Sequence, residues 1–316
     1  RNMYKIALVL PYFGPFSNYF PFFLASCAQN KTVDFHIFTD QPMPAAAENI
    51  VVHPCAFGQF AEKFRKAFDF PIPHLQRPYN LCDFKPAYGL ALREELKGYD
   101  FWGHCDCDLI FGNIRAFFPD ELLGQYNRLL RRGHLTLYRN VESVNTFFMR
   151  RVAGVPYYKD VYQSSPEKIW SFDEAGGTAL QWMKQAPEAL YDEIVFDDIG
   201  WLRKEFVSSQ KANLGLDKGK KFVTFRKSGL ELFRQYLDEK TGKVEEEATC
   251  YAHFQKRPFK VNTSDTTEYL IVPNSFEPVR EISLSERRKV AGGGLYLYPW
   301  KTRWNNLKRK IKNIKG

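Results

Sequence analysis

The chain has 316 residues and a formal charge of +9 at pH 7, and 44% of its residues are hydrophobic, including 16% aromatic residues. This composition excludes an intrinsically disordered chain and supplies enough apolar side chains for a large core. No apolar run approaches the ~18–20 residues that cross a bilayer, and no secretion signal precedes the first predicted strand. The six cysteines follow no disulfide pattern, so we expect reduced thiols and a cytoplasmic protein.

Strands and helices alternate over residues 3–140. Apolar runs predict strands at residues 4–10, 33–39 and 50–53, and a helix at residues 17–30. The pattern continues with a helix at 86–97 that Asp83 would cap, a strand at 100–110, a helix at 115–130 and a strand at 135–138. This order predicts an α/β fold with a Rossmann-like, mostly parallel sheet, in which ligands bind at the carboxyl ends of strands.

The second half of the chain is less regular. Strands are predicted at residues 222–226 and 230–236, and a return strand at 244–254 follows the turn-rich segment 238–243. This order indicates a C-terminal hairpin. The glycine run at residues 292–294 separates this part from a basic tail.

Asp106 and Asp108 form an Asp-x-Asp motif at the end of a predicted strand. The chain has neither a G-x-G-x-x-G loop after its first strand nor a Walker sequence, so a bound nucleotide needs another way to neutralise its phosphates. Two such carboxylates can bind one Mn²⁺ or Mg²⁺ ion, which bridges the phosphates of a nucleotide-sugar. The alternative is a solvated turn with an N-cap aspartate.

The cysteines beside this motif allow a second interpretation. A zinc site would use His104, Cys105 and Cys107 together with Cys82 or Cys250. There is no second closely spaced cysteine pair, so we favour small core cysteines over zinc ligands.

Four motifs occur in an order typical of one enzyme class: LPYFG at residues 10–14, CDFKPAYG at 82–89, the Asp-x-Asp motif through Gly112, and YAHFQK at 251–256. With them the chain resembles bacterial glycosyltransferases of the GT-A fold that build capsule, exopolysaccharide or lipopolysaccharide. It is more distantly similar to glycogenin-like and lipopolysaccharide galactosyltransferases. The resemblance implies a metal-dependent hexosyltransferase that uses a nucleotide-sugar, UDP-linked by expectation.

The resemblance also implies roles for single residues. His253 would be the third metal ligand beside Asp106 and Asp108, and Lys256 would hold a diphosphate oxygen, although the glycine expected between His253 and Lys256 is missing. Without the resemblance, His253 is an ordinary strand histidine. The nucleotide-sugar would further contact side chains at strand ends and at the start of a predicted helix: Tyr12, Phe13, Thr39, Asp40, Asp83, Lys85 and Asp106. For these residues, turn chemistry and helix capping are the alternatives.

Two acidic segments could supply a general base for the acceptor hydroxyl. Asp173 is our first candidate because glycines follow it at residues 176 and 177, and Glu174, Asp197 and Asp198 come next. An inverting transfer needs such a base opposite the leaving group, whereas a retaining transfer does not. Helix caps or surface acids are the alternative, and the sequence leaves inversion and retention open.

The tail has a helical pattern of its own. Its apolar stripe consists of Trp300, Trp304, Leu307, Ile311 and Ile314, and lysines and arginines cover the other faces. Such a helix is typical of one that lies in an anionic membrane interface, and the alternatives are a helix docked on the protein itself or RNA binding.

The sequence therefore predicts a GT-A-like catalytic domain at residues 3–285 and a membrane-association segment at 286–316. Residues 3–140 would bind the nucleotide-sugar and residues 141–285 the acceptor. We expect a lipid-linked saccharide acceptor of bacterial surface polysaccharide assembly, a location at the inner face of the plasma membrane, and no nucleic acid. The alternatives are a metal-dependent nucleotidyl- or phosphotransferase that uses the same aspartates, and a non-catalytic protein that binds membranes or nucleic acid.

Overall fold

The structure, a computed structural model, describes residues 3–44, 47–255, 257–292 and 296–304. The chain divides into two compact units. The first unit contains Arg1–Ser17, Cys27–Cys107 and Arg115–Glu193, and the second contains Asn18–Ser26, Asp108–Ile114 and Ile194–Gly316.

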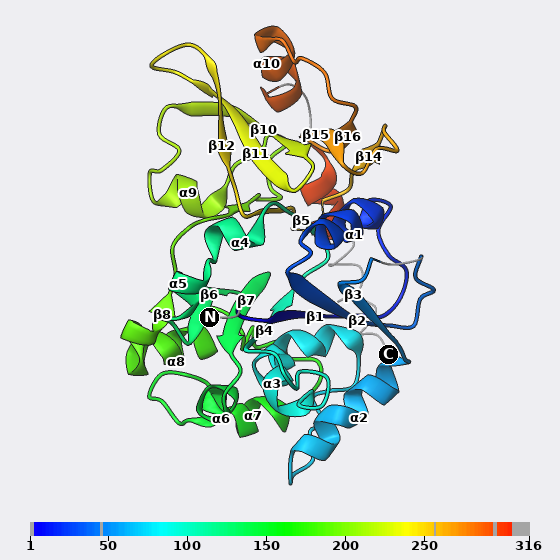
Figure 1. The fold of residues 1–316 in the computed structure, drawn as a ribbon, viewed down its shortest axis with the longest axis vertical. Coiled ribbons are helices and arrows are strands. Elements are labelled where there is room, and N and C mark those ends of the chain that lie inside the picture. Colours follow the sequence, from blue (N-terminus) through cyan, green and yellow to red (C-terminus); the bar gives the residue numbers. More distant parts are fainter. Residues whose placement is uncertain (1–2, 45–46, 256, 293–295, 305–316) are drawn as a thin grey trace. The chain divides into compact units, whose positions relative to one another are not determined.

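A seven-stranded mixed sheet forms the centre of the first unit (Figure 1). Its strands, in spatial order, are β3 (Ile50–Pro54), β2 (Val33–Thr39), β1 (Ile6–Tyr12), β4 (Phe101–Cys105), β7 (Leu135–Arg139), β6 (Arg128–Arg132) and β8 (Leu190–Tyr191). Neighbouring strands are parallel except at β7, which is antiparallel to β4 and to β6. The chain moves from β1 outward to β3 and then returns to place β4 on the other side of β1. The sheet edge between β1 and β4 is therefore a topological switch point, the usual place of a ligand in such folds.

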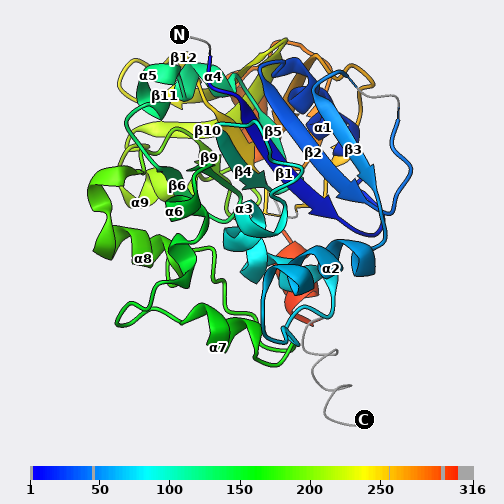
Figure 2. The same cartoon turned by 60° about the horizontal axis from the view of Figure 1, so that its bottom comes forward.

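Helices cover one face of this sheet (Figures 1 and 2). They include α2 (Phe57–Ala67), the 3₁₀ helix η1 (Pro78–Ala87) and α3 (Tyr88–Ala91). In α2, Phe60, Ala61 and Phe64 lie on one side of the helix and are buried, as the helical period dictates. They join Val9 and Phe38 of the sheet in one aromatic-rich core. The predicted α/β class with a mostly parallel sheet and flanking helices is confirmed.

The remaining helices of the first unit are short. They are α5 (Asp120–Leu123), α6 (Glu142–Asn145), η2 (Phe147–Met149), α7 (Tyr158–Tyr162), α8 (Thr178–Gln185) and η3 (Pro187–Ala189). The predicted helix over residues 115–130 is wrong, since this segment holds only α4 (Ile114–Phe117), α5 and the start of β6. Pro119 lies between the two short helices, and a proline has no N–H to continue a helix.

The predicted helix over residues 86–97 is also largely wrong. Only α3 is α-helical there, and Asp83 lies inside η1 instead of capping a helix. Pro86 disfavours α-helical geometry at the residue before it, so no α-helix begins at Asp83, and α3 ends before Leu92, whose φ of −114° and ψ of 31° depart from the α-helical values. The strand predicted over residues 100–110 is divided into β4 and β5 (Leu109–Phe111), and the Asp-x-Asp motif forms the turn between them.

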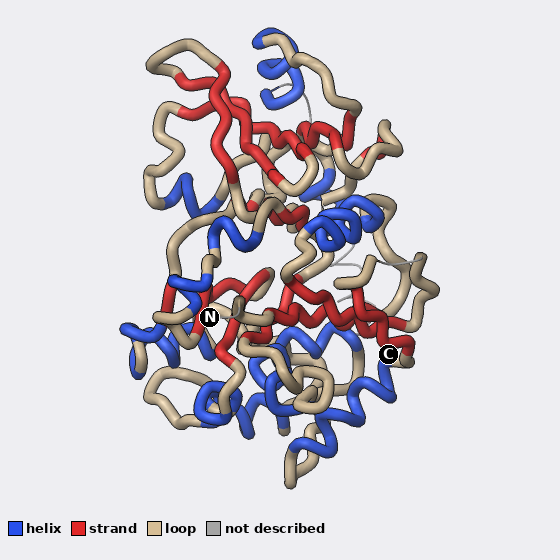
Figure 3. The backbone as a smooth tube through the Cα atoms, in the orientation of Figure 1, coloured by secondary structure: helices blue, strands red, loops and turns tan. Residues whose placement is uncertain are grey.

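The second unit contains two sheets. Six strands form the larger one, in the order β12 (Val244–Ala248), β11 (Glu231–Asp238), β10 (Lys220–Ser228), β15 (Glu268–Val272), β16 (Ser275–Glu277) and β14 (Lys260–Val261). The predicted hairpin is confirmed as the antiparallel pair of β11 and β12, labelled in Figure 1 and drawn as red tube segments in the same orientation in Figure 3. The smaller sheet has the order β5, β13 (Tyr251–His253) and β9 (Asp197–Asp198). The predicted return strand at 244–254 is therefore two strands, β12 and β13, in different sheets.

Three helices complete the description: α1 (Phe20–Gln29), α9 (Ser209–Asn213) and α10 (Leu284–Gly292). None of the helices within the described ranges combines the length and the apolarity that a bilayer crossing requires. Trp300 and Trp304 are exposed in a helical stretch at residues 298–304. The rest of the predicted membrane stripe, at 305–316, lies outside the described residues.

Candidate active site

Lys85 is the centre of a buried polar cluster in the first unit. It lies on η1, and its ammonium donates to Asp106 Oδ1 at 2.9 Å and to the carbonyl of Gly133 at 2.6 Å. Asp173 Oδ2 lies 3.5 Å from the same ammonium. Burial disfavours the charged amine, but the carboxylates of Asp106 and Asp173 outweigh this effect and hold the pKa of Lys85 well above its usual value. The cluster therefore keeps a permanent cation beside the first aspartate of the Asp-x-Asp motif.

Asp173 is the buried acid of this cluster, and only 1% of the residue is exposed. Burial raises its pKa to about 7, although the charge of Lys85 acts in the opposite direction. Its Oδ2 accepts no hydrogen bond from any described residue. The ammonium of Lys85, 3.5 Å away, is the charge that this buried oxygen faces. Asp173 can thus take up a proton near neutral pH.

Gly133 makes room for this acid. A Cβ at this position would lie 2.7 Å from Asp173 Oδ2 and 2.7 Å from Glu174 Oε1, closer than real Cβ atoms come to other heavy atoms. The glycine therefore lets the carboxylates approach the backbone, and its carbonyl fixes Lys85. Sequence analysis did not single out Gly133, because it lies far from Asp173 and Glu174 along the chain.

Asp83 holds two segments of the first unit together. It is fully buried, and its carboxylate accepts hydrogen bonds from the backbone amides of Trp170 at 3.1 Å and Phe172 at 2.9 Å. His74 Nε2 lies 2.8 Å from the same carboxylate. Both carboxylate oxygens of Asp83 therefore have partners within the protein. It joins η1, which carries Lys85, to the loop that carries Asp173. Sequence reasoning missed the partner His74.

The strand-end residues occupy the carboxyl edge of the sheet. Thr39 ends β2, and it lines with Asp40 a cavity of about 590 Å³ that Pro42, Val52 and Cys55 also line. The amide of Gly14 donates to Asp40 and lowers the pKa of that carboxyl.

Tyr12 and Phe13 stand at the end of β1. The ring of Tyr12 stacks on Phe16 at 5.1 Å between centroids. Phe13 packs against Phe57 and Phe60 of α2. Phe13 is therefore a core residue at this edge, whereas Thr39 and Asp40 face a cavity.

His253 is the centre of a second cluster, in the second unit. Strand β13 is flanked by β5 and β9, and these pairings set His253 opposite Leu109 and Asp198. The imidazole Nδ1 lies 2.8 Å from Asp198 Oδ1, and Nε2 lies 3.3 Å from Asp108 Oδ1. Gln255 donates to the same Asp198 oxygen at 2.8 Å. The backbone amide of Phe254 donates to the carbonyl of Asp108 at 2.9 Å, which fixes the two segments to each other.

Both carboxylates favour the imidazolium form of His253. Burial lowers its pKa, but Asp108 and Asp198 outweigh burial and raise the pKa to about 10. A divalent cation supplies the same positive charge, and a carboxylate on Nδ1 is the usual support of a histidine that binds a metal through Nε2. The donor set of Asp108 and His253 Nε2, with Asp198 behind the ring, therefore fits a divalent cation.

Asp106 and Asp108 are separated only by Cys107, so their Cα atoms lie at most about 7 Å apart.

Asp197, weighed beside Asp198 as a base, lies on the other side of β9 and is fully buried. It pairs with Arg234 at 3.1 Å and Lys211 at 3.2 Å, which makes it part of an ion-pair network. Lys256, predicted at the diphosphate, lies outside the described residues.

Cys105 and Cys250 are buried, as the core interpretation expects, whereas Cys82 and Cys107 are only partly buried. All six are free thiols, and burial raises the pKa of both Cys105 and Cys250. Within the described ranges, no group of three candidate metal ligands includes a cysteine. His104 is fully buried on β4, and burial holds its pKa well below the usual value.

Comparison with known proteins gives one family and several distant folds. The profile of a family described as "Family of unknown function (DUF6625)" matches residues 8–280. Among curated proteins, none matches the chain.

Solved structures show distant similarity. They include galactosyltransferase LgtC in complex with donor and acceptor sugar analogues, at 11% identity over 79% of this chain and 87% of that one, with a TM-score of 0.38. Glycosyltransferase GlyE of Streptococcus pneumoniae has 10% identity over 61% of this chain and 45% of that one, with a TM-score of 0.30. Mouse xyloside xylosyltransferase 1 has 10% identity over 80% and 98%, with a TM-score of 0.36. These low scores leave the function to be argued from the residues themselves.

Proposed function

The chain belongs to the DUF6625 family of unknown function, and we propose that it is a metal-dependent glycosyltransferase that moves a hexose from a nucleotide-diphosphate-sugar to a saccharide acceptor. The observation that carries the proposal is the imidazole of His253, held by Asp198 on one nitrogen and facing Asp108 with the other. Asp106 lies two residues before Asp108 in the sequence, and its carboxylate contacts the ammonium of Lys85.

Asp108 and His253 would hold the cation, Mn²⁺ or Mg²⁺, and Asp106 would join them. When bound, the cation would neutralise the diphosphate of the donor and stabilise the charge of the leaving group. Asp198 would keep the imidazole in the orientation that presents Nε2. It acts through His253, so we assign it a positioning role in place of the catalytic role expected from the sequence.

Lys85 would bind an oxygen of the donor. Its charge is permanent, and its position is fixed by the carbonyl of Gly133 and by Asp106. A preorganised cation of this kind stabilises negative charge without reorganisation during the reaction.

Asp173 would accept the proton of the acceptor hydroxyl. A base is most effective when its pKa lies near the working pH, and the pKa of Asp173 is about 7. Glu174, the next residue, raises that pKa by its own charge and is the second candidate.

The cavity at Thr39 and Asp40 would receive the nucleoside of the donor, for which we propose UDP. It lies at the carboxyl edge of the sheet, and the Asp40 carboxylate could accept from a uracil N–H. Lipid-linked saccharides of bacterial surface polysaccharides would be the acceptors, and the basic tail would bring the enzyme to the inner face of the plasma membrane.

The test is a transfer assay with a panel of UDP-sugars, Mn²⁺ and mixed saccharide acceptors, in which released UDP is measured. We expect activity in the wild type and its loss in Asp108→Ala and in His253→Ala. Asp69→Ala is the matched control, because Asp69 is exposed and lies outside both clusters. Wild-type activity in the Asp108 and His253 variants would contradict the proposal. Release of pyrophosphate instead of UDP would indicate a nucleotidyltransferase.

A further inference from the structure

We propose that a cavity lined by Arg151, Tyr157, Asp160 and Trp170 binds a neutral sugar residue of a saccharide. Naming this saccharide the acceptor rests on the proposed function, whereas the binding itself does not. The cavity lies within the first unit, and neither the Lys85 cluster nor the His253 cluster contributes to its lining.

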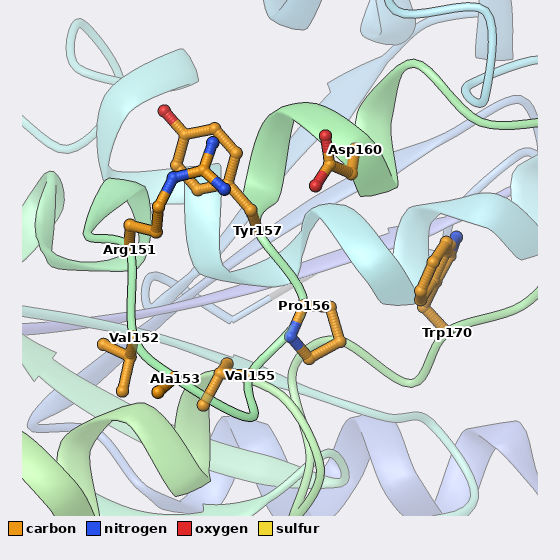
Figure 4. Close-up of a pocket in the computed structure, with 8 residues that line it drawn as sticks. All are labelled: Arg151, Val152, Ala153, Val155, Pro156, Tyr157, Asp160 and Trp170. Carbon is orange, nitrogen blue, oxygen red and sulfur yellow. The ribbon is translucent and has the colours of Figure 1, made fainter.

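The size and lining of the cavity suit a small polar ligand with apolar faces. Its volume is about 510 Å³, inside the ~300–1,000 Å³ that ligand sites occupy. Figure 4 shows the wall formed by the loop from Val152 to Pro156, with the rings of Tyr157 and Trp170 on either side of Pro156. Both rings are half-buried, so each keeps part of its surface open.

The lining is held in place before any ligand binds. Trp170 Nε1 donates to Ser164 Oγ at 2.9 Å, and the Trp170 backbone amide donates to the buried Asp83. On the loop side, Lys184 Nζ donates to the carbonyl of Ala153 at 2.7 Å. A site whose side chains are already fixed loses less entropy when a ligand binds.

The charges of the lining favour a neutral ligand. The guanidinium of Arg151 lies 3.8 Å from the ring centroid of Tyr157, and the exposed carboxylate of Asp160 faces the same space (Figure 4). The one cation and the one anion of the lining balance, and the ammonium of Lys168 lies over the Trp170 ring at 3.1 Å from its centroid, so a sugar would pack on the ring surface that Arg151 and Lys168 leave open. A sugar hydroxyl can donate to Asp160 and accept from Arg151, while the C–H face of the sugar packs on an aromatic ring.

The cavity is joined to the proposed base by a short segment of chain. Asp83 accepts from the amides of both Trp170 and Phe172, and Asp173 follows directly. A sugar that contacts Trp170 would therefore bind the start of the segment 170–173. Asp173, at the end of this segment, is the group proposed to take the proton of the acceptor hydroxyl. This geometry points to the acceptor in preference to the donor.

The experiment measures binding of the full chain to a printed array of neutral and acidic oligosaccharides, without nucleotide or Mn²⁺. We expect binding to neutral glycans, weakened about tenfold or more in Trp170→Ala, as for a buried aromatic anchor. Asp160→Asn, at an exposed position, is a second variant that does not threaten the fold, and it should also weaken binding. Trp300→Ala is the matched control, since Trp300 is exposed and outside the cavity, and it should bind as the wild type does.

No binding by the wild type, binding to acidic glycans only, or unchanged binding in both Trp170→Ala and Asp160→Asn would overturn the inference. Asp108→Ala should bind the array normally while losing transfer. The two proposals therefore fail independently of each other.

Discussion

Replacing Lys85 with methionine tests the charge balance of the first cluster. Methionine retains the length of the side chain but removes the ammonium that lies 2.9 Å from Asp106 and 3.5 Å from Asp173. Breaking a buried pair by removing one partner costs about 3–5 kcal/mol, because the other charge stays buried. At ~2–4 °C per kcal/mol for a unit of this size, the melting temperature should fall by roughly 6–20 °C.

The loss of stability caused by Lys85→Met should depend on pH. The pKa of Asp173 is about 7 in the folded chain against an ordinary value of 3.8, so the folded chain binds this proton more tightly than the unfolded chain does. Stability associated with Asp173 is therefore present at acid pH and is lost as the pH rises from 3.8 through 7. Removing Lys85 raises the pKa of Asp173 further. The penalty of Lys85→Met should thus grow by up to about 1.4 kcal/mol between pH 5, where Asp173 is protonated in both proteins, and pH 8, which lies one unit above the pKa of Asp173 in the wild type.

The assay is thermal unfolding of four proteins at pH 5 and pH 8: wild type, Lys85→Met, Asp173→Asn and the double variant. Asp173→Asn removes the charge that Lys85 balances, so Lys85→Met should cost less in that background at pH 8. An equal loss of melting temperature at both pH values and in both backgrounds would refute the reasoning.

Three further predictions concern other parts of the two clusters. If Asp173 is the base, kcat/KM should rise with pH up to about 7 and then level off, and Asp173→Asn should lower it by about 10²–10⁴-fold without that rise. Gly133→Ala should destabilise the protein by about 1–3 kcal/mol in thermal unfolding, because its Cβ would meet Asp173, whereas Gly58→Ala, with open space around it, should be neutral or stabilising. In calorimetric titrations with Mn²⁺, Asp198→Asn should weaken binding by about 10–100-fold, because His253 loses its support, and unchanged affinity would remove the positioning role.

Local pattern predicted the parallel part of the fold. The strand at residues 33–39 follows from an apolar run that ends in a polar residue, whereas the strand predicted over residues 100–110 is divided after Cys105. The predictions failed where proline interrupts an otherwise helical pattern. At Pro86 and Pro119 the apolar spacing favours a helix, but the missing amide and the clash with the preceding residue decide the backbone.

The residues of the candidate site could be proposed from the sequence, but the side chains that contact them could not. Asp106, Asp108 and His253 belong to motifs that indicate their chemistry. The partner of His253 depends on the register between β13 and β9, which is a pairing of distant segments. The contacts of Asp83 with the loop before Asp173 likewise arise only when the chain folds back.

The central position of β13 has a consequence for biosynthesis. Strand β13 lies after residue 250 and pairs with β5, which lies before residue 112. The ladder between the two strands therefore joins residues that are far apart in the sequence. Such contacts form slowly and late. A nascent chain that has not yet emerged past Tyr251 therefore exposes the edge of β5 without its partner, which makes it prone to aggregation. The proposed metal site would be complete only after His253 has left the ribosome.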